Sequence, residues 1–116
     1  MAIINNVPIA KRLKQARLAA KLSQKKLGIL AGIDEFSSSA RMNQYEKSKH
    51  IPDFLTLNNI AQVLLVPTAY FYAQDDSLAE LLCLYHNLGQ NSKKQILYLC
   101  KKLATNEIVA KESLYV

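Results

Sequence analysis

The sequence contains only two cysteines, three glycines and three prolines, and it has no tryptophan. This scarcity excludes a disulfide scaffold and a collagen-like repeat, and the 50% hydrophobic content excludes a disordered chain. No stretch reaches the roughly 18 apolar residues that a membrane-spanning helix needs, and no basic N-terminal flank leads into a long apolar segment. We therefore expect a compact soluble protein of the cytoplasm.

Residues that usually carry catalysis are also few and dispersed. The two histidines, His50 and His86, form no pattern with a nucleophile or with paired carboxylates, and there is no glycine-rich phosphate loop. Cys83 and Cys100 each lie in an apolar helical pattern, which favours reduced core thiols. The alternative is a zinc or redox site of Cys83, His86 and Cys100, but it lacks a fourth ligand. We expect no enzyme, no metal and no cofactor.

Positive charge is concentrated in the N-terminal half of the chain. Residues 1–52 carry ten Lys and Arg against three Asp and Glu, whereas residues 53–116 carry five against six. The net charge is therefore +7 in the first part and −1 in the second. A polyanionic partner would bind the N-terminal half, and nucleic acid is the polyanion that this asymmetry favours.

Apolar residues recur at helical spacing along most of the chain, and strand signals are nearly absent. The spacing predicts seven helices, over about 8–21, 24–31, 40–47, 54–66, 68–72, 75–88 and 93–104. Ser23 is a suitable N-cap for the second helix and Gly32 a suitable end. Ser38 or Ser39 can cap the third helix after a polar loop that begins at Asp34. The predicted fold class is all-α.

The second and third helices, joined by the turn at Gly32, form a helix-turn-helix arrangement. At about 100° per residue, Met42 and Tyr45 point to one side of the third helix and Glu46 lies on their flank. The opposite face carries Ala40, Asn43, Gln44 and Lys47. Exposed amide and basic side chains are what the reading of base-pair edges requires. The predicted core of the fourth helix consists of Phe54, Leu57, Ile60, Ala61 and Leu64.

A set of residues between positions 9 and 73 resembles the Cro/C1-type (XRE) helix-turn-helix family of phage repressors and bacterial transcriptional regulators. The set comprises Arg17, Leu22-Ser23-Gln24, Leu27, Ala31-Gly32-Ile33, Met42, Tyr45-Glu46, Pro52, Leu57, Ile60-Ala61, Leu64 and Val66. It is specific because it combines the Ser-Gln pair, the small-residue turn and the glutamate at the end of the third helix. The resemblance implies a five-helix lambda-repressor-like domain over residues 8–74.

The same resemblance implies roles for individual side chains. Gln24 and the N-terminus of its helix would contact a DNA phosphate, with Lys25 adding positive charge. Arg17 and Glu46 would form a salt bridge between the first helix and the end of the third. The positions that read bases in the family are occupied by Ser39, Ala40, Arg41, Asn43 and Gln44. Arg41 suits guanine, Asn43 or Gln44 suits adenine, and Ala40 suits a thymine methyl. The loop that follows the phosphate backbone would contain Lys47, Lys49 and His50.

The chain departs from the family pattern in three places. Gly28 replaces an alanine, which preserves close packing but lowers helix propensity by up to about 1 kcal/mol. Ser48 stands where the family usually has glycine. About four residues are inserted over 34–37, and the insertion puts the start of the third helix in question.

Residues 75–116 lie beyond the family pattern and are predicted to form a C-terminal helical hairpin, whose two helices are apolar on more than one side. Such helices need cover on two faces, and a second copy of the chain can provide the second cover. We expect a dimerisation region that uses Leu81, Leu84, Tyr85, Leu97 and Leu99. The alternative is a helical hairpin absorbed into the core of one chain.

The sequence as a whole therefore predicts a homodimeric regulator of transcription that binds double-stranded DNA specifically, as a repressor on an inverted-repeat operator. The expected partners are DNA and a second copy of the chain, and no association with a membrane is expected. One alternative is the antitoxin of a toxin-antitoxin pair, whose C-terminal helices bind a protein partner. Another is a protein-interaction module that uses the same fold without DNA.

Overall fold

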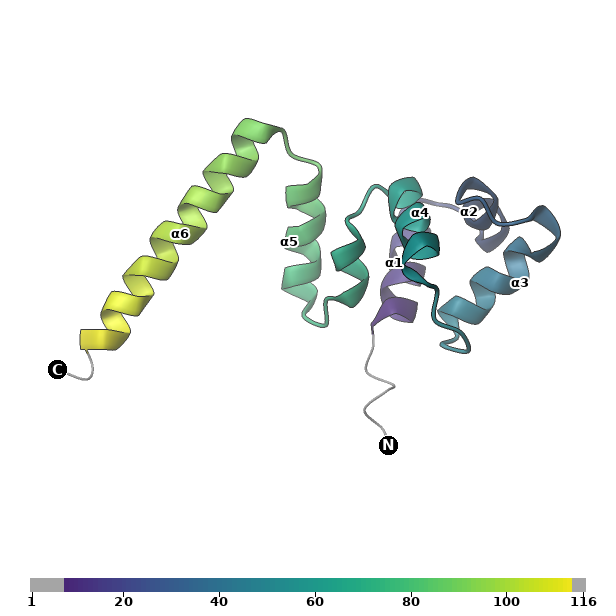
Figure 1. Ribbon diagram of the computed structural model, residues 1–116, viewed down its shortest axis with the longest axis horizontal. Coiled ribbons are helices and arrows are strands. Elements are labelled where there is room, and N and C mark those ends of the chain that lie inside the picture. The colour runs from purple at the N-terminus through teal and green to yellow at the C-terminus, as the bar shows by residue number, and fades with distance from the viewer. Residues whose placement is uncertain (1–7, 114–116) are drawn as a thin grey trace. The chain divides into compact units, whose positions relative to one another are not determined.

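The computed structural model describes residues 8–113, and all regular elements within that range are helices (Figure 1). They are α1 (Ile9–Ala19), α2 (Gln24–Leu30), α3 (Glu35–Glu46), α4 (Phe54–Leu64), the 3-10 helix η2 (Thr68–Tyr72), α5 (Asp76–His86) and α6 (Gln90–Ser113). The chain divides into an amino-terminal unit ending at His86 and a carboxy-terminal unit beginning at Asn87. The predicted all-α class with a helix-turn-helix fold is confirmed.

Four helices of the amino-terminal unit begin at a side-chain cap. The Ser23 hydroxyl accepts a hydrogen bond from the backbone N–H of Lys26 at 3.0 Å, as predicted for the start of α2. Aspartates cap the other three helices, namely Asp34 for α3, Asp53 for α4 and Asp75 for α5. Each cap satisfies a backbone donor that the first turn of a helix leaves without a partner. The helix boundaries are therefore encoded locally.

The core of the amino-terminal unit is formed where α1, α2, α3, α4 and η2 meet. Its fully buried apolar side chains are Leu13, Leu27, Met42, Leu57, Ile60 and Phe71. The predicted burial of Met42, Tyr45 and the later residues of α4 is confirmed. The predicted burial of Phe54 is wrong, because its side chain is 66% exposed. It is the first residue of α4, where the helix begins outside the packed core.

The start of α3 is the main difference from the sequence prediction. The expected loop over 34–39 is replaced by a helix that begins at Glu35, because the Asp34 carboxylate accepts from the backbone N–H of Phe36 at 3.0 Å. Ser38 and Ser39 therefore lie inside the helix and do not cap it. The inserted residues add about one turn to the N-terminal end of α3.

The added turn of α3 packs tightly against α2, and Figure 1 shows the two helices side by side. The fully buried Ser38 hydroxyl donates a hydrogen bond to the backbone oxygen of Lys25 at 2.7 Å. A Cβ atom at Gly28 would lie 1.9 Å from Ser38 Oγ. A larger residue at position 28 would require Ser38 to shift, and this close approach explains the departure from the usual alanine.

Four described residues have a positive φ, namely Lys21, Gly32, Ser48 and Leu65, and two of these, Gly32 and Ser48, end the segments of α2 and α3. Gly32 ends the α2 segment with φ of +91°, a conformation that favours glycine. Ser48, which follows α3, has φ of 61°. The αL conformation of Ser48 explains why glycine suits this position, and the chain after α3 adopts the required turn without it.

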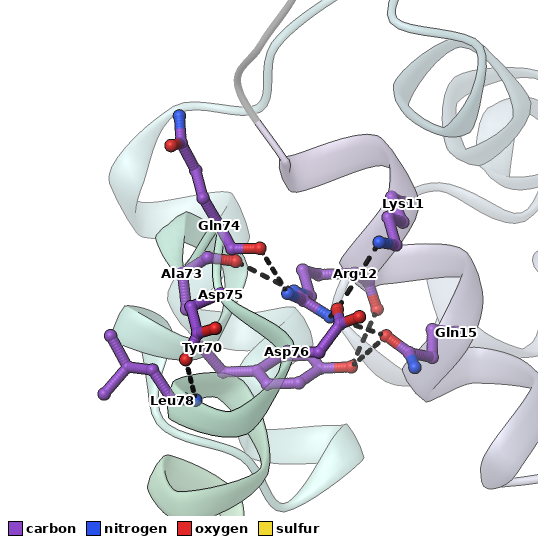
Figure 2. A network of polar contacts seen from close by, with 9 residues as sticks. All are labelled: Lys11, Arg12, Gln15, Tyr70, Ala73, Gln74, Asp75, Asp76 and Leu78. Atoms are coloured by element: carbon purple, nitrogen blue, oxygen red, sulfur yellow. Dashed lines mark hydrogen bonds and ion pairs between the residues drawn. The ribbon is translucent and has the colours of Figure 1, made fainter.

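Helix α5 belongs to the amino-terminal unit, which therefore extends beyond the boundary expected after Gln74. The side chain of Arg12 in α1, which is only 1% exposed, holds the start of α5 in place (Figure 2). Its guanidinium donates to the backbone oxygens of Ala73 and Gln74 at 2.9 and 3.1 Å, and it forms an ion pair with Asp76 at 3.0 Å. Ala79 completes the attachment by lying in the core.

The carboxy-terminal unit contains α6, which runs from Gln90 to Ser113. This helix is longer than the predicted segment 93–104 at both ends, and it includes part of the turn expected over 89–92. No glycine or proline follows Gly89, so nothing in the sequence interrupts the helix. Among the described residues, no helix is long and apolar enough to cross a membrane.

Candidate nucleic-acid interface

The outward face of α3, which we define as Ala40, Asn43, Gln44 and Lys47, is accessible to a partner. Three of these residues are exposed and Gln44 is half-buried. Ser38, Met42 and Tyr45 occupy the opposite side of the helix and are buried. The structure therefore separates a core-facing side from a polar side, as the helical spacing predicted.

A buried ion pair fixes the C-terminal end of α3 against α1. Arg17 Nε lies 2.6 Å from Glu46 Oε2, and Arg17 Nη2 donates to Glu46 Oε1 at 3.0 Å. The two side chains are 11% and 3% exposed, and Arg17 also donates to the backbone oxygen of Leu22 at 2.8 Å. Bidentate geometry and burial make this pair a rigid joint between helices. The pair implied by the family resemblance is present in the structure.

Gln24, at the start of α2, connects this ion pair to the outward face of α3. Its side-chain amide donates to Glu46 Oε1 at 3.2 Å and to Asn43 Oδ1 at 3.3 Å. Asn43 is thereby held in place from α2. In this structure Gln24 positions another side chain of the interface, in addition to any contact it makes with a ligand.

Arg41 lies on a different side of α3 from Asn43. Its guanidinium donates to the Tyr45 hydroxyl at 2.8 Å and lies 5.9 Å from the centre of the Tyr45 ring. Ser39, by contrast, is exposed on the flank near Asn43. The five residues assigned to base reading therefore do not form one stripe, because Arg41 is directed toward the edge of the helix.

The exposed positive charge of the N-terminal half is smaller than the sequence suggests. Arg12 and Arg17 count among the ten basic residues of the N-terminal half, yet both are buried and bound within the protein. The eight exposed basic residues are Lys11, Lys14, Lys21, Lys25, Lys26, Arg41, Lys47 and Lys49. His50 is also exposed. Sequence reasoning missed the burial of Arg12 because its acceptors lie about sixty positions away along the chain.

The residues assigned to dimerisation are accessible in both units. On α5, Leu81, Leu84 and Tyr85 are exposed, while Ala79 on the same helix is buried. On α6, Leu97 and Leu99 are exposed, as are Tyr98 and Leu103. Each helix therefore presents apolar side chains to its surroundings.

In the described range, no group of three or more His, Cys, Asp or Glu side chains is arranged to hold a metal ion.

Comparison with known proteins identifies the family. A scan against protein-family models and a search of curated proteins gave no match. Among solved structures, the crystal structure of the transcriptional regulator BswR is 46% identical in sequence, with a TM-score of 0.77 over 84% of this chain and 96% of that chain. The chain belongs to the family of the transcriptional regulator BswR. At this identity over nearly the whole of BswR, the similarity extends to the helix-turn-helix and beyond it.

Proposed function

We propose that this BswR-family regulator is a Cro/C1-type protein that binds double-stranded DNA sequence-specifically and acts as a homodimeric repressor in the cytoplasm. The observation that carries the proposal is the outward face of α3. It presents amide and ammonium groups from a helix that is braced by α2 and by the Arg17–Glu46 pair. A rigid helix with such groups fits the major groove, where hydrogen bonds to base edges determine specificity.

Within this proposal, Ala40, Asn43 and Gln44 of the outward face read bases, and Lys47 of that face contacts phosphate together with nearby basic residues. Asn43 and Gln44 pair with adenine, and Ala40 contacts a thymine methyl. The phosphate contacts come from exposed residues before and after the helix, namely Lys25, Lys47, Lys49 and His50. Arg41 and Ser39 lie on the two flanks of the face and contact bases or phosphates at its edge.

The exposed apolar side chains of α5 and α6 support the proposed homodimer. Burying Leu81, Leu84 and Tyr85, together with Leu97 and Leu99, against a second copy removes their surface from water. A two-fold axis would place two copies of α3 on one duplex. The preferred site is then an inverted repeat with half-sites about one helical turn apart.

Selection of bound fragments from random duplex DNA tests the central proposal. We expect an enriched inverted repeat, and an affinity that falls steeply with salt because lysines displace counterions from the DNA. With roughly 4 to 8 phosphate contacts per dimer, the slope of log K against log salt should lie near −4 to −7. No enrichment together with a flat salt response would refute DNA binding.

A pair of variants separates base reading from phosphate contact. Gln44→Ala should weaken binding to the selected site by about 1 to 3 kcal/mol and change binding to random DNA little. Lys25→Ala is the matched control, because it removes an exposed charge and should weaken both DNAs equally. Gln24→Ala is unsuitable as this control, since its amide also positions Asn43 and Glu46.

The same apolar surfaces suit a different protein partner, as an antitoxin would require. Light scattering on the purified chain distinguishes the two cases. A dimeric mass supports the homodimer. A monomeric mass with tight binding to a single half-site would overturn it, and co-purification with a second protein would favour the antitoxin alternative.

A further inference from the structure

The added turn of α3 carries an exposed aromatic ring. Phe36 is 97% exposed, which is the largest exposed fraction among the large apolar side chains that the structure describes. Its backbone N–H is held by the Asp34 carboxylate at the start of the helix. The ring therefore projects from a capped helix, where its position is defined, and it contributes little to the core.

Helical geometry places Phe36 in line with the outward face of α3. Phe36, Ala40, Asn43 and Lys47 follow one another at alternating spacings of four and three residues, which defines one stripe along an α-helix. The other side of the helix is packed against the protein, because the Ser38 hydroxyl is hydrogen-bonded to α2 and Met42 is fully buried. The helix cannot rotate to bury the ring without breaking these contacts.

The charges at this end of α3 limit what the ring can contact. Asp34 and Glu35 are both exposed and place negative charge at the first turn, which disfavours a phosphate contact there. A phenylalanine side chain offers only apolar and aromatic surface. In the major groove, the apolar group on a base edge is the C5-methyl of thymine.

We propose that Phe36 is a specificity-determining residue that contacts the C5-methyl group of a thymine, beyond the base pairs read by Ala40 and Asn43. The inference rests on the proposed function, because it requires α3 to enter the major groove. It extends the reading stripe by one helical turn at the N-terminal end, where helix-turn-helix proteins place residues against base edges.

Replacing thymine by deoxyuridine tests this contact, because the exchange removes only the methyl group. Each thymine of the selected site is replaced in turn, and the affinity of the full chain is measured by titration. We expect wild-type protein to lose about fourfold in affinity at one position of each half-site, the ratio expected for losing one buried methyl-sized group. Phe36→Ala should bind the thymine-containing site about fourfold more weakly and be insensitive to deoxyuridine at that position.

Phe54→Ala is the matched control, because Phe54 is also an exposed phenylalanine in a first helical turn but lies on α4. This variant should keep the wild-type response to deoxyuridine. Urea unfolding checks that Phe36→Ala folds normally, which we expect because the ring is exposed and alanine is a better helix former.

The outcomes separate the two proposals. If Phe36→Ala responds to every deoxyuridine as wild type does, the ring makes no methyl contact and this inference is wrong, while base reading by Gln44 remains testable on the same site. If Phe36→Ala instead changes the mass measured by light scattering, the ring contacts protein, which also overturns it. If selection enriches no site, the proposed function itself fails.

Discussion

Replacing Gly28 by alanine tests the close contact between α2 and α3 that positions the outward face. The new Cβ would lie 1.9 Å from Ser38 Oγ and 3.0 Å from Ser38 Cβ. Neither neighbour can move freely, because Ser38 is fully buried and its hydroxyl is bonded to the Lys25 backbone oxygen. The helices must therefore separate, or the serine must give up its hydrogen bond.

The expected size of the effect follows from three contributions. Overpacking a tight contact costs about 1 to 3 kcal/mol. Loss of the buried Ser38 hydrogen bond costs about 0.5 to 1.5 kcal/mol. Alanine in place of glycine in a helix gains up to about 1 kcal/mol. Together these contributions predict that Gly28→Ala lowers the free energy of unfolding by about 0.5 to 4.5 kcal/mol, although the same exchange stabilises most helices.

Urea unfolding followed by circular dichroism measures this change as a lower midpoint at an unchanged slope. Gly89→Ala is the control, because a Cβ there meets nothing within 4 Å and the free energy of unfolding should stay within about 1 kcal/mol of wild type. In the double variant Gly28→Ala with Ser38→Gly the clash is absent, so the two losses should not add and the coupling should be about 1 kcal/mol or more. A neutral or stabilising Gly28→Ala would refute the close contact.

Three further predictions concern stability. Glu46→Ala leaves Arg17 buried without its partner and should destabilise the fold by about 3 to 5 kcal/mol, whereas a loss below about 1 kcal/mol in urea unfolding would show that the pair is not buried as described. Ser48→Gly should raise the free energy of unfolding by about 0.5 to 1 kcal/mol because residue 48 has a positive φ; no gain in Tm would contradict that backbone geometry. Hydrogen bonding to Arg12 and the charge of Lys11 lower the pKa of Asp76 below 3.8, so its contribution is complete above that pH and is lost as the pH falls through the lowered pKa. Asp76→Asn should therefore have a lower Tm than wild type at neutral pH, with the difference shrinking in acid; a constant difference would oppose this assignment.

Local signals in the sequence were sufficient for most helices and for the core. Ser23 caps the start of α2 with its hydroxyl, and Gly32 ends that segment with a positive φ. The apolar spacing of α4 predicts the burial of Leu57 and Ile60. The start of α3 was misplaced because several residues in a row can cap a helix. Asp34 takes this role in the structure, since helix geometry from Glu35 onward lets Ser38 reach α2.

Long-range partners account for what local reasoning missed in the candidate site. From its neighbours in sequence, Arg12 is expected to be an exposed basic residue of α1. Its burial depends on the backbone oxygens of Ala73 and Gln74, which are distant in the sequence. The bond between Gln24 and Asn43 likewise joins two residues that each suit DNA contact alone. Phe36 could have been noticed, because an Asp-Glu pair before it is a typical helix start.

The chain has three arginines, and the protein interior holds two of them. The positive surface is therefore composed almost entirely of lysine. An ammonium group is a compact, strongly hydrated ion that attracts a phosphate without fixing its orientation, unlike the planar fork of a guanidinium. A protein attached to the DNA backbone in this way can diffuse along the duplex with small energetic barriers. In the proposed complex with DNA, stopping at a particular site depends on the short stripe of α3, and chemical acetylation of the exposed lysines should shorten the path along which the protein searches the duplex.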